Sequence, residues 1–91
     1  MISRDVVFRD RYGLHPRSAH RIGQALAGTL SRVTIQQMEA GRPPLDARSM
    51  LALVSSGIQA GDQVRVTADG ADEESVLTNI ASLLESGVCH P

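Results

Sequence analysis

A histidine at the expected start of a helix is the residue best placed to do chemistry in this sequence. His15 is followed by Pro16, and proline is favoured at the first helical position because the N–H that it lacks is not needed there. The His15 ring would lie beside free backbone N–H groups, at the positive end of the helix dipole, where an anion can bind. A neutral imidazole is a nucleophile. With Arg17 two residues on, it could accept and pass on a phosphoryl group.

Seven elements are expected to position this histidine: strand, helix, strand, strand, helix, strand and helix. The apolar spacing predicts strands over 3–9, 32–37 and 63–68, long helices over 16–27 and 72–85, and a short helix between Ser49 and Gly57. Any further strand around 42–45 should be short or at an edge, because its two prolines cannot donate to a sheet. The first long helix should present one small-to-apolar face: Ala19, Ile22, Gly23, Leu26, Ala27 and Leu30.

The alternation of apolar and polar residues predicts strands with one buried face, which is typical of an antiparallel sheet covered on one side. We therefore expect the α+β class, with an open-faced two-layer sandwich of a four-stranded antiparallel sheet and three helices on one face, in the order β-α-β-β-α-β-α.

Composition excludes several classes of protein. The chain has 91 residues, enough for one domain, and a formal net charge of -1. One Tyr, one Phe and no Trp argue against nucleic acid as a partner. The single cysteine, Cys89, excludes an intrachain disulfide. With no signal peptide or long apolar run, we expect a cytoplasmic protein without membrane insertion. We also expect a monomer, because no long apolar face is left uncovered.

No metal or other cofactor is expected. His20 follows His15 by five residues, which places the two rings roughly 140° apart around a helix, a poor arrangement for a shared metal. Cys89 and His90 lack a second pair of ligands at zinc-like spacing.

Three segments of the sequence resemble the HPr family, the histidine-containing phosphocarriers of the bacterial phosphotransferase system. Gly13-Leu14-His15 with Arg17 resembles the active-site segment of that family. Its second signature is similar to Arg48-Ser49-Met50 followed by Gly57-Ile58 and Gly61-Asp62. Its last strand and turn are similar to Val64, Val66, Ala68, Gly70 and Asp72.

The resemblance implies a single HPr-like domain over 1–88, followed by a tail at 89–91. It also implies that His15 takes a phosphoryl group on Nδ1 from phosphorylated enzyme I and passes it to enzyme IIA domains in sugar uptake. Arg17 would be the electrostatic partner of this transfer. Such a protein is a carrier with a covalent phosphohistidine intermediate rather than a stand-alone enzyme.

The sequence departs from the family pattern beside the histidine. The family usually has alanine or threonine where this chain has Pro16, and proline where it has Ser18. Pro16 removes a backbone N–H that could point at the phosphoryl group, and the Ser18 hydroxyl could partly replace it. The turn before Ser49 is also longer than usual and rich in proline.

The second signature leaves two questions open. Ser49 is a good helix N-cap, and the resemblance adds regulatory phosphorylation by HPr kinase/phosphorylase. Met50 and Leu51 are candidates for the interface with enzyme I and enzyme II, with a place in the core as the rival interpretation.

Two other functions remain alternatives. One is a regulatory adaptor, in a nitrogen-branch or dihydroxyacetone-kinase relay, whose His15 and Ser49 phosphorylation is read by protein partners. The other is a small-ligand or protein-binding module that is never phosphorylated.

Overall fold

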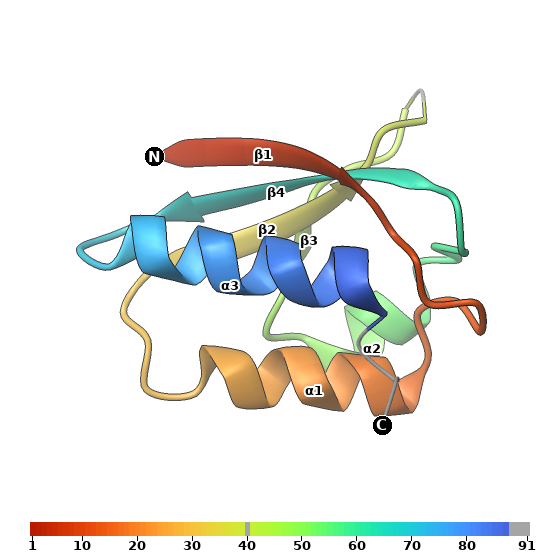
Figure 1. The fold of residues 1–91 in the computed structure, drawn as a ribbon, viewed down its shortest axis with the longest axis horizontal. Coiled ribbons are helices and arrows are strands. Elements are labelled where there is room, and N and C mark those ends of the chain that lie inside the picture. The colour runs from red at the N-terminus through yellow and green to blue at the C-terminus, as the bar shows by residue number, and fades with distance from the viewer. Residues whose placement is uncertain (40, 88–91) are drawn as a thin grey trace.

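The computed structural model describes residues 1–39 and 41–87, and its seven elements follow the predicted order (Figure 1). The elements are β1 (Ile2–Val7), α1 (Pro16–Leu26), β2 (Arg32–Gln37), β3 (Leu45–Asp46), α2 (Met50–Val54), β4 (Gln63–Asp69) and α3 (Glu73–Ser86). The tail predicted at 89–91 lies outside the described residues.

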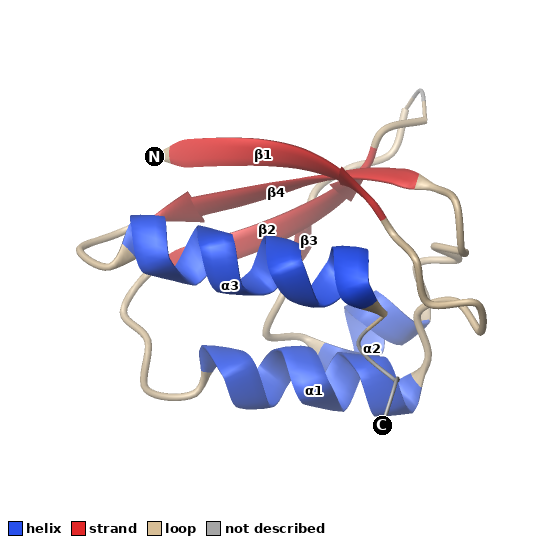
Figure 2. Ribbon diagram, in the orientation of Figure 1, coloured by secondary structure: helices blue, strands red, loops and turns tan. Residues whose placement is uncertain are grey.

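The four strands form one antiparallel sheet in the order β1-β4-β2-β3. The three helices lie together on one face of the sheet (Figure 2). The other face is polar: Arg65 and Asp5, opposite each other on β4 and β1, are joined by a bond of 2.7 Å from Nε to Oδ1. The predicted open-faced two-layer sandwich is therefore confirmed.

The core fills the space between the sheet and the helices. The strands bury alternate residues, and each helix buries one side. The largest fully buried hydrophobic side chains are Phe8, Ile22, Leu26, Val33, Ile35, Leu53, Val64, Val66, Ile80 and Leu84.

The predicted apolar face of α1 was too wide. Gly23 and Ala27 are exposed, and Leu30 is 77% exposed. The helix ends at Leu26, and Gly28 at φ +80° turns the chain out of the helix. Leu30 therefore no longer follows the helical spacing from which its burial was predicted.

Two strands also differ from prediction. β1 ends at Val7 instead of at residue 9, although Phe8 stays buried and its N–H donates to the Asp62 carbonyl at 2.9 Å. β3 is short and lies at the edge of the sheet, as predicted, but it comprises Leu45–Asp46 rather than 42–45. The two residues before it, Pro43 and Pro44, have no N–H to give to a sheet.

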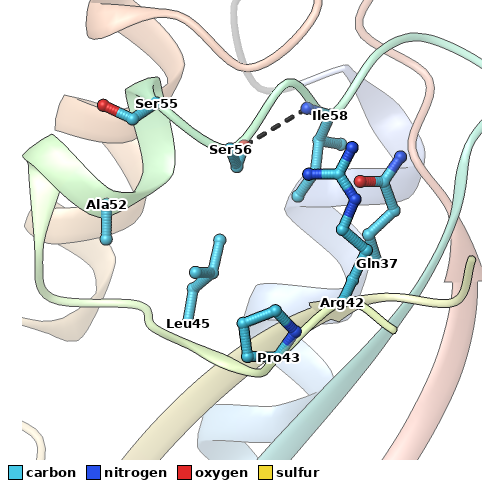
Figure 3. A pocket seen from close by; sticks show the side chains of 8 residues that line it. All are labelled: Gln37, Arg42, Pro43, Leu45, Ala52, Ser55, Ser56 and Ile58. Carbon is cyan, nitrogen blue, oxygen red and sulfur yellow. Dashed lines mark hydrogen bonds between the residues drawn. The ribbon is translucent and has the colours of Figure 1, made fainter. Parts of the chain in front are cut away.

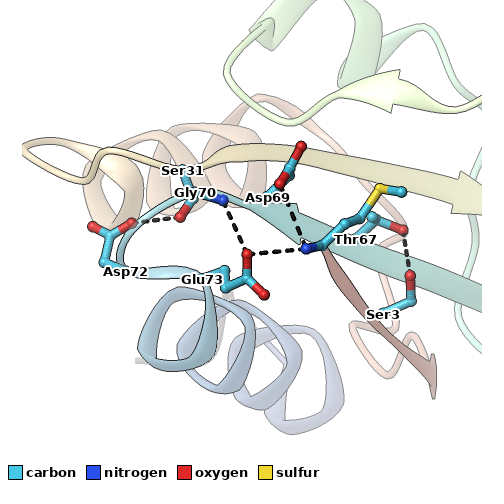
Figure 4. Close-up of polar contacts among 8 residues, drawn as sticks. Ser3, Ser31, Thr67, Asp69, Gly70, Asp72 and Glu73 are labelled. Carbon is cyan, nitrogen blue, oxygen red and sulfur yellow. Dashed lines mark hydrogen bonds and ion pairs between the residues drawn. The ribbon is translucent and has the colours of Figure 1, made fainter.

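A polar cluster joins the loop before β2 to the turn between β4 and α3 (Figure 4). Asp72 accepts the Leu30 N–H at 2.9 Å and the Ser31 hydroxyl at 2.5 Å. The hydrogen bond from Ser31, and after it the one from the Leu30 N–H, holds the pKa of the Asp72 carboxyl below its usual value. The cluster fixes the end of the molecule where α1 ends and α3 begins.

No helix in the described part of the chain is both long and apolar enough to cross a membrane.

Candidate functional site

His15 occupies the N-cap of α1, as predicted. Its backbone is extended, with φ −127° and ψ 177°, and its Nδ1 accepts the Arg17 N–H at a nitrogen-to-nitrogen distance of 3.2 Å. An imidazole nitrogen that accepts a hydrogen bond carries a lone pair and no proton. The Nδ1 lone pair therefore faces the first turn of the helix, and the half-buried ring is within reach of a partner.

Ser18 holds the backbone of this histidine in place. Its fully buried side chain accepts the His15 N–H at 3.0 Å and lies 3.0 Å from the His15 carbonyl, to which its hydroxyl donates. The structure thus gives Ser18 a contact with the His15 main chain, whereas the sequence suggested one with a phosphoryl group. That second contact stays a prediction.

Pro16 and Arg17 form the exposed side of the first turn. Pro16 takes the first helical position and leaves the Arg17 N–H as the first amide available there. The Arg17 guanidinium is exposed and makes no hydrogen bond or ion pair with any residue in 1–39 or 41–87. An oxyanion bound at Nδ1 would therefore meet a main-chain N–H and a nearby cation.

Two residues of the loop before the histidine contact its ring and were not predicted from the sequence. Asp10 is 4% exposed, and its Oδ2 lies 3.8 Å from His15 Nε2. Its Oδ1 accepts the Tyr12 N–H at 3.0 Å. The Tyr12 ring packs edge-on against the imidazole, with 6.2 Å between the ring centroids.

A signal for this arrangement was present in the sequence. An aspartate in a loop commonly accepts a backbone N–H two residues on, as Asp10 does, and a glycine follows at the third position. The Gly13 N–H closes the turn on the Asp10 carbonyl at 3.0 Å.

The loop that carries His15 is anchored against the connection between α2 and β4. The Leu14 N–H donates to the Ile58 carbonyl at 2.9 Å. Gly13, at φ +76°, passes so close that an added Cβ would lie 3.1 Å from the same carbonyl oxygen. The glycine therefore lets two motifs that are far apart in the sequence meet.

The short helix α2 packs beside α1 (Figure 1). Ser49 is its N-cap, and the Ser49 Oγ accepts the Ala52 N–H at 3.2 Å. Met50 is 45% exposed and Leu51 is 78% exposed, so neither belongs to the core. Together they form an apolar surface next to α1.

Arg48 is a further residue whose role the sequence did not reveal. Its guanidinium donates to the Ser31 carbonyl at 2.8 Å and to the Thr29 hydroxyl at 2.7 Å. The arginine thereby joins the residue before the α2 cap to the loop after α1 and fixes how the two helices sit relative to each other.

A pocket of about 260 Å³ lies between α2 and the segment that contains β3 (Figure 3). It is lined by Gln37, Arg42, Pro43, Leu45, Ala52, Ser55, Ser56 and Ile58. None of the predicted site residues lines it, so this pocket is separate from the histidine. In the described part of the chain, no group of three or more His, Cys, Asp or Glu side chains could hold a metal ion.

Comparison with known proteins gives a consistent picture. The family model described as "PTS HPr component phosphorylation site" matches residues 2–86. A "Phosphocarrier protein HPr" from Streptomyces coelicolor is 33% identical over 76 residues, which cover 84% of this chain and 80% of that protein. A crystal structure of HPr-C-His from Thermoanaerobacter tengcongensis is 26% identical, with a TM-score of 0.83, covering 94% of this chain and 93% of that one.

Longer proteins match as well. A "Multiphosphoryl transfer protein" from Escherichia coli O157:H7 is 28% identical over 88 residues, or 97% of this chain. The chain spans only 23% of the length of that relative.

Proposed function

The chain belongs to the HPr family of the phosphotransferase system, and on that premise we propose that it accepts a phosphoryl group on His15 from enzyme I and donates it to enzyme IIA domains in sugar uptake. The observation that carries this proposal is the contact between His15 Nδ1 and the Arg17 N–H, 3.2 Å apart. It places the lone pair of a nucleophile at the N-terminus of a helix, where a phosphoryl group is favoured.

The reaction is an in-line displacement at phosphorus. The Nδ1 lone pair forms the new N–P bond, the bond from phosphorus to the donor group breaks, and the donor keeps that electron pair. Negative charge on the equatorial oxygens is stabilised by positioned donors during such a transfer. Here the Arg17 N–H and guanidinium supply them, and the exposed position of that side chain lets it approach.

Mapping of the modified residue tests the proposal. Wild-type protein incubated with enzyme I and phosphoenolpyruvate is expected to gain one acid-labile phosphoryl group, which peptide mapping places on His15. The absence of an adduct, or an adduct on another residue, would overturn the proposed function.

The apolar surface of Met50 and Leu51 is the proposed docking site for these partners. An exposed leucine on a helix beside α1 contributes little to the stability of the fold but is typical of a transient interface. Leu51→Asp is therefore expected to raise the KM for this protein in the enzyme I reaction by about tenfold, since truncation of a central interface residue costs roughly 1–2 kcal/mol. The unfolding free energy should change by less than about 0.5 kcal/mol.

Leu30→Asp is the matched control for this measurement. Leu30 is as exposed as Leu51, at 77%, but lies in the loop between α1 and β2, at the opposite end of α1 from His15. The KM of the Leu30→Asp variant in the enzyme I reaction should equal that of the wild type. Equal effects of the two aspartates would contradict a docking site at α2 and point to a general effect of charge.

Regulation at Ser49 is a second candidate role, favoured by the cap geometry. The Ser49 Oγ already accepts a backbone N–H of α2 at 3.2 Å. A phosphate there would keep this contact at a helix start, where its charge is tolerated, and would repel an acidic partner from the adjacent apolar surface. Incubation with HPr kinase/phosphorylase and ATP, followed by mapping, tests this role.

A further inference from the structure

The only charged side chain that is buried among the described residues belongs to Asp10, in the loop before the reactive histidine. A buried carboxylate is costly unless hydrogen bonds or an opposite charge compensate it. One oxygen, Oδ1, accepts the Tyr12 N–H at 3.0 Å. The other, Oδ2, faces His15 Nε2 at 3.8 Å.

The two nitrogens of the His15 ring therefore face groups of opposite kind. Nδ1 faces a donor, the Arg17 N–H, and Nε2 faces an acceptor, the Asp10 carboxylate. The partner on one ring nitrogen decides which nitrogen carries the proton. Both contacts favour the same tautomer, with the proton on Nε2 and the lone pair on Nδ1.

We propose that Asp10 is a positioning residue, which fixes this tautomer and balances the charge on the ring during transfer. The inference rests on the proposed function of His15. When the Nδ1 lone pair bonds to phosphorus and the donor leaves with its electron pair, Nε2 keeps its proton and the ring becomes positive. The Asp10 Oδ2 lies next to that proton.

The distance of 3.8 Å fits an ion pair and is longer than a hydrogen bond. In free enzymes such contacts are often long and tighten only as charge develops in the reaction. Asp10 is held from behind, because Oδ1 binds the Tyr12 N–H and the Asp10 carbonyl accepts the Gly13 N–H. The ring can therefore approach a fixed carboxylate.

The substitution Asp10→Asn removes the negative charge of the side chain and keeps its shape. The amide oxygen keeps the bond to the Tyr12 N–H, so the NH₂ group is turned toward Nε2. A donor at that place favours the lone pair on Nε2 and the proton on Nδ1, which removes the proposed nucleophile. The same exchange beside a catalytic histidine in a serine protease produces the wrong tautomer.

The chemical shifts of the ring nitrogens report the tautomer without any phosphoryl donor. At about pH 9, where an imidazole is neutral, wild-type His15 is expected to carry its proton on Nε2, and Asp10→Asn is expected to move it toward Nδ1. Phosphoryl acceptance should slow by at least about tenfold, a smaller loss than for the protease because the pair here is longer. Asp5→Asn, which alters an aspartate paired with Arg65 on the open face of the sheet, should change neither.

Each result decides between the alternatives. The proposal is overturned if wild-type His15 carries its proton on Nδ1. This measurement uses the wild-type protein alone, so it does not depend on whether a variant folds. It is also overturned if the tautomer or the transfer rate of Asp10→Asn equals that of the wild type. A different result would refute the proposed function and leave the positioning of the ring by Asp10 intact. In that case, Asp10→Asn would change the tautomer as expected, but the wild-type protein would take no phosphoryl group from enzyme I.

Discussion

Replacing His15 with alanine is expected to abolish phosphoryl transfer from enzyme I, because the residue supplies the nucleophile. The substitution also removes the side chain that caps α1, since Nδ1 accepts the Arg17 N–H. Loss of an N-cap costs about 1 kcal/mol of stability. The expected result is transfer at the background level in a protein that still folds, measured by incorporation from phosphoenolpyruvate and by thermal unfolding.

Two control variants separate the chemistry from the cap. His15→Asn keeps a strong N-cap residue but has no nucleophilic nitrogen, so it should regain most of the lost stability and none of the transfer. His20→Ala removes an exposed histidine further along the same helix and should transfer at the wild-type rate. Transfer by His15→Asn would show that the phosphoryl group goes elsewhere.

The sequence predicted the parts of the fold that depend on local patterns. The alternation in 63–68 matched a strand that buries Val64, Val66 and Ala68, and Pro16 marked the first residue of α1. The prediction that Leu30 lies on the apolar face of α1 was wrong, because the helical spacing was extended past the helix end predicted at residue 27, whereas α1 ends at Leu26. A hydrophobic period describes a face only as far as its helix extends.

Prediction of the site was limited in the same way. His15 was found because proline and the apolar spacing mark a helix start, which is local information. Asp10 was not predicted as a site residue, because its contact with His15 depends on tertiary structure. The side chain is buried, and a turn brings its Oδ2 to 3.8 Å from Nε2 of the imidazole. Arg48 was not recognised as a link between helices because its partners, Ser31 and Thr29, lie more than one element away.

Replacing Gly70 with alanine is expected to cause a large loss of stability. Gly70 leads from β4 toward α3, and its backbone passes against Ser31 (Figure 4). An added Cβ would lie 2.6 Å from the Ser31 Cα, a backbone atom that cannot move aside alone. Overpacking of this kind costs roughly 1–3 kcal/mol, and we expect the upper part of that range in denaturant unfolding.

The loss should exceed the steric cost because Ser31 also binds Asp72. A displaced Ser31 lengthens its bond to the Asp72 carboxylate, which also accepts the Leu30 N–H at 2.9 Å. Gly23→Ala provides a control of opposite sign. Gly23 lies inside α1 with no atom within 4 Å of an added Cβ, so alanine should stabilise the protein by about 0.5–1 kcal/mol. If both substitutions destabilised the protein equally, the close approach of Gly70 to Ser31 would not be the cause.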